Sequence, residues 1–304
     1  MISLSLTETI FSSWRLKHTV FVRGYYKRTE SDTKMKDMLS AYMRTGNKKV
    51  QGWLSPIGLH VIAQLASIQK EMGIIGAVGE IGVHHGRLFI LLHLLSDQSE
   101  KSVAWDLFER QEENVDGSGR GNRSIFVENL RKNGCDLERI KIFSENSMDL
   151  TIEAVLEASE GKLRLFSIDG GHTAEITYND LSLARKTLVE GGLIILDDFF
   201  HEAWPGVAEG TCRYMREHDN ALFPVIITGN KYIFTNNESA AKIYIDRLAK
   251  PQKGYYPKRS CVFGKEVLIL LPITTIKGAI TQSKIWRNIR NKPLGLFLRR
   301  IVRG

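Results

Sequence analysis

Acidic residues stand in two short clusters in the middle of the chain, where they could bind a cation or move a proton. Asp169 belongs to the segment IDGGH, and Asp197 and Asp198 directly follow the segment GGLIIL. Three carboxylates that meet in a partly dry cleft repel one another unless a cation lies between them. Oxygen ligands of this kind suit a hard cation such as Mg²⁺. The alternative is that one aspartate caps a helix and the others are solvated loop charges.

His172 stands three residues after Asp169, where a helix is expected to begin. Its neutral imidazole titrates near the working pH, so His172 is the first candidate for a general base, and Asp169 is the second. The alternative is a hydrogen-bonded histidine that only orients Asp169.

Two buried strands are needed to position these groups. Leu163–Ile168 and Leu193–Leu196 are continuous apolar runs, as in strands of a parallel sheet that is covered on both faces. Thr173–Glu190 has the length of the crossover helix, and Gly191 and Gly192 are expected to end it. Both strands would then end at the same edge of the sheet, where open α/β sheets bind ligands. The three aspartates are therefore expected to face one crevice.

A glycine-rich turn precedes these strands. A short apolar strand reaches Glu80, breaks at Gly82 and Gly86, and is followed by a buried helix over Arg87–Leu95. Glycines at such a turn let the backbone approach a ligand closely, and the helix start presents free N–H groups. The spacing ExGxxxG differs from the GxGxxG dinucleotide fingerprint. Taken alone, it also fits a structural tight turn.

An acidic residue ends the next predicted strand. Asp106 follows Ser102–Trp105, at the place where an acidic side chain in this topology binds the hydroxyl pair of a ribose, with Glu109 and Glu112 as nearby alternatives. The loop over residues 114–123 is rich in glycine and is either a mobile lid or a flexible connection.

The alternation of strands and helices through Leu196 predicts an α/β fold with a doubly wound, Rossmann-like, mostly parallel sheet. A helix over Ile57–Met72, which begins after Ser55 and Pro56, precedes the first strand.

The motifs ExGxxxG, the acidic end of the second strand, IDGGH and GGxxxxDD resemble those of class I S-adenosylmethionine-dependent methyltransferases. More narrowly, they resemble the metal-dependent O-methyltransferases of the macrocin and antibiotic-sugar type, over roughly residues 55–235. The resemblance implies a seven-stranded sheet with an antiparallel terminal hairpin. Gly206–His218 would be the helix before that hairpin, and Pro224–Thr228 and Lys231–Thr235 would be its strands.

The resemblance also implies roles for particular residues. The cofactor S-adenosylmethionine would be bound by Glu80, Gly82 and Gly86 on its methionine and ribose part, by Asp106 on the ribose hydroxyls, and by Asn146 and Ser147 near the adenine. Mg²⁺ or a similar divalent cation would be bound by Asp169, Asp197 and Asp198. The predicted function is methyl transfer to a hydroxyl of a sugar, glycan precursor or secondary metabolite. Trp204 could stack on a sugar face, or could be a partly buried loop aromatic.

Three regions are expected: a basic and aromatic arm over residues 1–54 without a clear period, a methyltransferase domain over 55–238, and a C-terminal extension over 239–304. In that extension we expect a helix over Ser239–Leu248, a break over Pro251–Pro257 and a strand over Val267–Leu271. Residues 273–304 carry eight Lys and Arg and no acidic residue. That basic amphipathic tail suits a peripheral contact with an anionic membrane, and suits a homo-oligomer contact nearly as well.

Composition narrows the class of protein. The three cysteines show no CxxC spacing, no stretch approaches eighteen uncharged apolar residues, and residues 1–10 lack the pattern of a signal peptide. We therefore expect a cytoplasmic location, with a peripheral membrane location as the alternative. A nucleic-acid methyltransferase is disfavoured because no NPPY-like or catalytic-cysteine motif occurs, and an NAD-dependent oxidoreductase because the glycine spacing differs. A catalytically silent methyltransferase-like module that docks on membrane or glycan machinery is the alternative function.

Overall fold

The computed structural model describes residues 30–252 and 254–273. The chain divides into two compact units, Met1–Asp37 and Met38–Gly304, and the sheet belongs to the second. The membrane or dimer contact expected of the basic tail lies almost wholly outside the described residues, as does most of the N-terminal arm. Among the described residues, no helix is both long enough and apolar enough to span a membrane.

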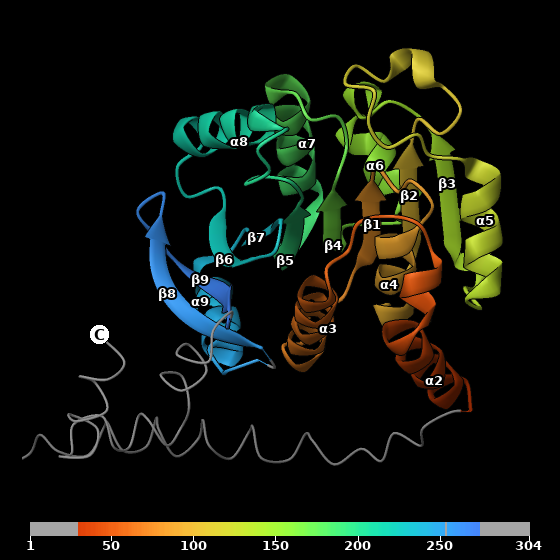
Figure 1. The fold of residues 1–304 in the computed structure, drawn as a ribbon, viewed down its shortest axis with the longest axis horizontal. Coiled ribbons are helices and arrows are strands. Elements are labelled where there is room, and N and C mark those ends of the chain that lie inside the picture. Colours follow the sequence, from red (N-terminus) through yellow and green to blue (C-terminus); the bar gives the residue numbers. More distant parts are fainter. Residues whose placement is uncertain (1–29, 253, 274–304) are drawn as a thin grey trace, which may run out of the picture. The chain divides into compact units, whose positions relative to one another are not determined.

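One mixed sheet forms the centre of the described fold. Its strands follow the order β3-β2-β1-β4-β5-β7-β6-β9-β8, which Figure 1 shows from right to left. Strands β3, β2, β1, β4 and β5 pair in parallel, which confirms the predicted doubly wound α/β fold. The bounds are β1 (Ala77–Ile81), β2 (Ser102–Asp106), β3 (Ile140–Ser144), β4 (Leu163–Ile168), β5 (Leu188–Leu196), β6 (Phe223–Thr228), β7 (Lys231–Thr235), β8 (Tyr255–Val262) and β9 (Lys265–Pro272).

The antiparallel part of the sheet begins with the predicted hairpin. β7 pairs with both β5 and β6, and Gly229 lies in the left-handed region at φ 59° in the turn. β9 then pairs with β6 in parallel and contains the strand predicted at Val267–Leu271. The expected break at Pro251–Pro257 is wrong in its second half, because β8 starts at Tyr255. Pro257 is tolerated there because β8 is an edge strand, whose outer side needs no N–H donor.

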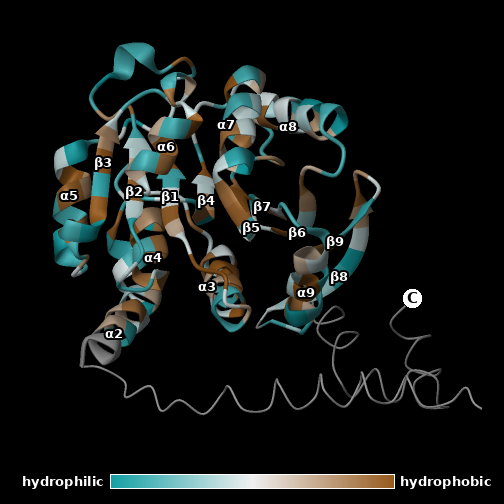
Figure 2. Ribbon diagram, turned by 180° about the vertical axis from the view of Figure 1, so that it is seen from behind, coloured by the Kyte–Doolittle hydropathy of each residue, from teal (hydrophilic) through white to brown (hydrophobic). Residues whose placement is uncertain are grey.

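Helices cover both faces of the sheet. α3, α4, α5 and α9 contribute to one apolar core, and α6, α7 and α8 contribute to the other. In Figure 2 the strands between these layers are largely brown, whereas the loop between β2 and α5 is mostly teal. The bounds are α2 (Glu30–Arg44), α3 (Pro56–Glu71), α4 (Arg87–Leu95), α5 (Arg123–Lys132), α6 (Ile152–Ala158), α7 (Ala174–Thr187), α8 (Pro205–Glu217) and α9 (Glu238–Leu248).

No element was predicted in the arm, and the structure has α2 there from Glu30. Its Tyr42 is buried and donates a hydrogen bond to the carbonyl of Arg87 at 2.6 Å. One further local prediction is wrong. The crossover helix ends at Thr187, and the glycine pair does not cap it. Gly191 instead lies inside β5 at φ 75°, where the pairing of β4 and β5 shifts register.

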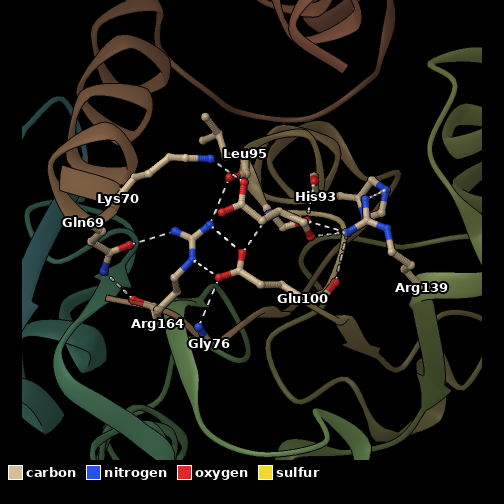
Figure 3. A network of polar contacts seen from close by, with 10 residues as sticks. Gln69, Lys70, Gly76, His93, Leu95, Glu100, Arg139 and Arg164 are labelled. Carbon is tan, nitrogen blue, oxygen red and sulfur yellow. Dashed lines mark hydrogen bonds and ion pairs between the residues drawn. The ribbon is translucent and has the colours of Figure 1, made fainter. Parts of the chain in front are cut away.

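A buried ion-pair network joins the elements at the amino ends of the parallel strands (Figure 3). The Arg164 guanidinium donates to both carboxylate oxygens of Glu100, at 2.8 and 2.9 Å, and to Gln69 of α3 at 2.9 Å. Glu100 also accepts from the N–H of Gly76, ahead of β1. Since the two charged side chains are only 5% and 3% exposed, each depends on the other for compensation of its buried charge.

A histidine and a second arginine extend this network. Arg139 donates to the carbonyls of Asp97 and Glu100, at 2.7 and 3.0 Å. His93 lies beside it, and burial together with the Arg139 charge lowers the pKa of His93 to about 3. The backbone N–H of Asp136 donates to Nε2 of His93, so the neutral ring carries its proton on Nδ1.

The variant Arg164→Met is expected to lower the free energy of unfolding by about 3–5 kcal/mol, because it leaves Glu100 buried without its cation. Lys70→Met is the matched control, since Lys70 pairs with Asp97 at the surface, where the side chains are 72% and 53% exposed. Its loss should stay below about 1 kcal/mol. Urea denaturation measures both, and equal midpoints for the two variants would contradict the assignment.

Candidate active site

The carboxyl ends of β1, β4 and β5 are fastened to one another by backbone hydrogen bonds. The N–H of Asp169 donates to the carbonyl of Ile81 at 2.9 Å, and the N–H of Asp197 donates to the carbonyl of Ile168 at 3.0 Å. Asp169 and Asp197 therefore leave neighbouring strands at the same level of the sheet. The expected crevice at this edge is present in the structure.

The turn after β1 leaves no room for a side chain at Gly82. Its φ is +81°, and a Cβ atom there would lie 1.7 Å from the carbonyl oxygen of Asp169. His84, two residues later, also has a positive φ, of 49°. The turn is therefore shaped by its contact with the end of β4 as much as by any ligand.

Asp106 holds this turn in place. Its carboxylate accepts hydrogen bonds from the backbone N–H groups of His84 at 2.7 Å and Phe108 at 2.6 Å. Burial raises the pKa of Asp106, and these hydrogen bonds oppose that shift without cancelling it. The carboxylate is thus fixed at the mouth of a cavity, ready to accept further hydrogen bonds.

One cavity lies over the ends of β1 and β2. Its lining includes four of the six residues predicted to bind the cofactor, namely Gly82, Asp106, Asn146 and Ser147. The other two do not line it. Glu80 is buried, with burial raising its pKa to about 8, and its Oε2 has no hydrogen-bond partner among the described residues. Gly86 is the residue before α4 and lies against Phe126.

A second cavity, of about 370 Å³, adjoins the first. The two cavities share part of their lining, namely Gly82, Asp106, Ser118, Gly119 and Asp169. The lining of the second cavity also includes the two other predicted metal ligands, the predicted base and three aromatic or imidazole groups, namely Asp197, Asp198, His172, Trp53, Trp204 and His84.

Lys231 lies at the bottom of this site and was not predicted. The side chain is 1% exposed and forms an ion pair with Oδ2 of Asp197. Burial lowers the pKa of Lys231, but the charges of Asp197 and Asp169 outweigh burial, so the net shift is upward. Burial and the neighbouring Asp197 raise the pKa of Asp169. In the sequence, Lys231 resembles an ordinary turn lysine, because it directly follows Gly229 and Asn230.

Asp116 is the second residue that was not singled out. Its Oδ2 accepts hydrogen bonds from the backbone N–H of His172 at 2.7 Å and from its ring Nδ1 at 2.8 Å. Nε2 of His172 lies 3.4 Å from Oδ2 of Asp198, and the ring stacks on Trp204 with centroids 4.3 Å apart. Burial lowers the pKa of His172, but the hydrogen bonds with Asp198 and Asp116 raise it overall.

The geometry brings together a set of possible metal ligands that differs from the predicted one. One ligand atom each from Asp169, His172 and Asp198 lies within 4.8 Å of the others. In the described part of the chain, Asp197 instead has its Oδ2 on the Lys231 ammonium. Two carboxylates and an imidazole fit a divalent cation, although a nitrogen ligand is less typical of Mg²⁺ than of transition metals.

Comparison with known proteins agrees with this arrangement. A family model described as a methyltransferase domain matches residues 80–199, which run from the end of β1 to the aspartates after β5. Residues 80–199 therefore form a methyltransferase domain. No curated protein matches the chain.

Solved structures share the fold of this methyltransferase at low identity. The O-methyltransferase NovP is 15% identical with a TM-score of 0.52, and the match covers 68% of this chain and 99% of that chain. An O-methyltransferase from Bacillus cereus in complex with SAH is 14% identical with a TM-score of 0.46, covering 75% and 97%. CalS11, a TDP-rhamnose 3'-O-methyltransferase, is 17% identical with a TM-score of 0.44, covering 68% and 95%. At 15% identity the likeness to NovP shows the fold alone.

In the methyltransferase, Gly82→Ala is expected to cost far more stability than Gly73→Ala. Both glycines have positive φ, which costs an alanine about 1–2 kcal/mol. Only at Gly82 does the new Cβ also collide with the backbone of Asp169, whereas nothing lies within 4 Å at Gly73. Urea denaturation of both variants isolates the collision, and equal losses would show that the turn can move away from β4.

Proposed function

We propose that this methyltransferase transfers the methyl group of S-adenosylmethionine to a hydroxyl of a sugar, glycan precursor or secondary metabolite. The observation that carries the proposal is that two cavities share part of their lining, Asp169 included, one lined by the predicted cofactor residues and the other by the base candidate and the aspartates. Reacting groups held in two adjoining cavities can lie close enough for direct transfer.

The cofactor would lie in the first cavity. Asp106 would accept hydrogen bonds from the ribose hydroxyls, while Asn146 and Ser147 would lie near the adenine.

His172 is the proposed base, with Asp169 as the alternative. In the neutral ring Nδ1 donates to Asp116 and Nε2 carries the lone pair, 3.4 Å from Oδ2 of Asp198. Nε2 would be free for an acceptor hydroxyl when the Asp198 carboxylate binds a cation instead of the ring. Nε2 can then take the proton of that hydroxyl.

A divalent cation, Mg²⁺ or similar, would be held by Asp169 and Asp198, with Asp197 joining them if it leaves Lys231. When bound, such an ion lowers the pKa of a hydroxyl that coordinates it. Nε2 of His172 has one lone pair, so the ring cannot ligate the ion and act as the base at once. We therefore assign His172 to proton transfer and the carboxylates to the ion.

The acceptor side offers aromatic surface. Trp53 lines the second cavity and is 69% exposed, whereas one face of Trp204 is occupied by the ring of His172. A sugar ring presents C–H groups that pack on an exposed indole face, so Trp53 is a better platform than the predicted Trp204.

Calorimetry should detect binding of S-adenosylhomocysteine to the intact chain. Asp106→Asn should weaken that binding at least about tenfold, or about 1.4 kcal/mol. The reason is that the amide donates a hydrogen bond at one of the two positions where the carboxylate accepts one. Asp149→Asn, an exposed residue near the same strand ends, is the control and should bind as the wild type does. The absence of binding to the wild type would end the proposal.

Removal of divalent ions with a chelator should abolish methyl transfer, and added Mg²⁺ or Mn²⁺ should restore it. Asp198→Asn should weaken Mn²⁺ binding at least about tenfold, as measured by electron paramagnetic resonance, because it removes one anionic ligand. Asp219→Asn, whose carboxylate is exposed and pairs with Lys265, is the matched control. Full activity in the chelator would exclude the ion from the reaction.

A further inference from the structure

We propose that Asp116 is a positioning residue that couples the loop over the cofactor cavity to the orientation of His172. The inference rests on the proposed function, because it assigns His172 to proton transfer. It adds Asp116, which lies outside the two acidic clusters, to the residues that act on His172. It also assigns the loop over residues 114–121 the role of orienting that histidine.

The contact between Asp116 and His172 is held at several points. Oδ2 of Asp116 accepts from both the backbone N–H and Nδ1 of His172, while Oδ1 accepts from the N–H of Ser118 at 2.8 Å. The side chains of Asp116 and His172 are 11% and 10% exposed, so water competes little for these bonds. Burial alone would raise the pKa of Asp116, but the hydrogen bonds from Ser118 and His172 lower it to about 2.

The loop has few other attachments. Within the described residues, the hydrogen bonds that leave residues 114–121 go to His172, apart from those between Asn114 and its neighbour Gln111. Gly117 and Gly119 have positive φ and open space around them, and Val115 is 66% exposed. Few packing contacts restrain this segment, so its closed position depends strongly on the bonds to His172.

The same loop forms a wall of the cofactor cavity. Six of its residues line that cavity beside Asp106 and Gly82, namely Asn114, Val115, Ser118, Gly119, Arg120 and Gly121. A cofactor that contacts this wall favours the closed loop, and the closed loop places the Asp116 carboxylate on Nδ1 of His172. By linkage, the orientation of His172 and the occupancy of the cavity stabilise each other.

The chemical consequence concerns the histidine tautomer. Asp116 accepts the proton of Nδ1, which leaves Nε2 with the lone pair on the side of the second cavity. An amide at position 116 offers one oxygen, which accepts less strongly than a carboxylate, so the proton is held less firmly on Nδ1 and part of the rings carry it on Nε2 instead. In those rings the lone pair points away from the acceptor, while the stacking of the ring on Trp204 is unchanged.

The test compares Asp116→Asn with Glu112→Gln, an exposed acidic residue at the start of the same loop. With the ring neutral, at about pH 9, nitrogen-15 NMR of the histidine rings should show the Nδ1–H tautomer of His172 in the wild type and Glu112→Gln. Asp116→Asn should move the ring toward the Nε2–H tautomer. Asp116→Glu, which keeps the carboxylate, should recover the wild-type signal at least in part.

Two further measurements test whether the loop, the cofactor and His172 are coupled. Trypsin should cut after the exposed Arg120, and S-adenosylhomocysteine should slow this cut several-fold in the wild type and less in Asp116→Asn. In turnover, Asp116→Asn should lower kcat about 100-fold with little change in the acceptor KM. His172→Gln serves as a second variant, and in it S-adenosylhomocysteine should also protect the loop less.

A wild-type tautomer and wild-type protection in Asp116→Asn would overturn the inference. That result differs from a failure of the proposed function, in which S-adenosylhomocysteine does not bind the wild type at all. The tautomer comparison needs no cofactor, so it decides the role of Asp116 toward His172 in either case.

Discussion

The site depends on the compensation of buried negative charge by Lys231. Asp169 and Asp197 leave adjacent strands, and Glu80 lies one strand away, so parallel pairing forces these acids together in a poorly hydrated cleft. Ions in such a place are stable only when a counter-charge accompanies them. Lys231 supplies that charge from the first residue of β7, which pairs with β5 in the antiparallel part of the sheet. The hairpin of β6 and β7 therefore supplies the cation that balances the negative charge of the cleft.

Lys231 also determines where a further cation can bind. Because its ammonium contacts Asp197, the carboxylates left for a ligand are those of Asp169 and Asp198, on the side of the second cavity. Asp198 is oriented by Asn230, the residue just before Lys231, whose amide donates to it at 3.1 Å. A single turn thus neutralises one aspartate and orients the other at the second cavity.

The parallel half of the fold was predictable because its signals are local. Continuous apolar runs that end in acidic residues identify β1, β2, β4 and β5, and the glycines at 82 and 86 identify the turn after β1. The edge strand β8 was missed because proline and glycine at 251–257 indicate a break. α2 was missed because its start shares the mixed, basic character of the arm.

Lys231 and Asp116 were missed for a different reason. Each lies in a hydrophilic turn or loop, and each gains its role only from a partner far along the chain: Asp197 is 34 residues from Lys231, and His172 is 56 residues from Asp116. The identity of a residue next to glycine and asparagine does not show whether its side chain points to water or into a cleft. The acidic residues at the strand ends can be recognised from the sequence around them. The lysine that balances their charge is brought to them only by the tertiary fold.

The two edges of the sheet differ in how far their buried polar groups are paired. At the amino edge, Arg164 and Glu100 satisfy each other and the surrounding backbone, so neither of these charges is left for a ligand. At the carboxyl edge, Oε2 of Glu80 and Nδ1 of His84 are buried without hydrogen-bond partners in the described part of the chain. Folded proteins rarely leave such atoms unpaired unless a ligand, ion or water completes them. The unpaired polar atoms at the carboxyl edge are tolerated because the completed hydrogen-bond network at the amino edge helps to hold the strands together. The sheet can therefore keep a cleft with unpaired polar atoms at its carboxyl edge.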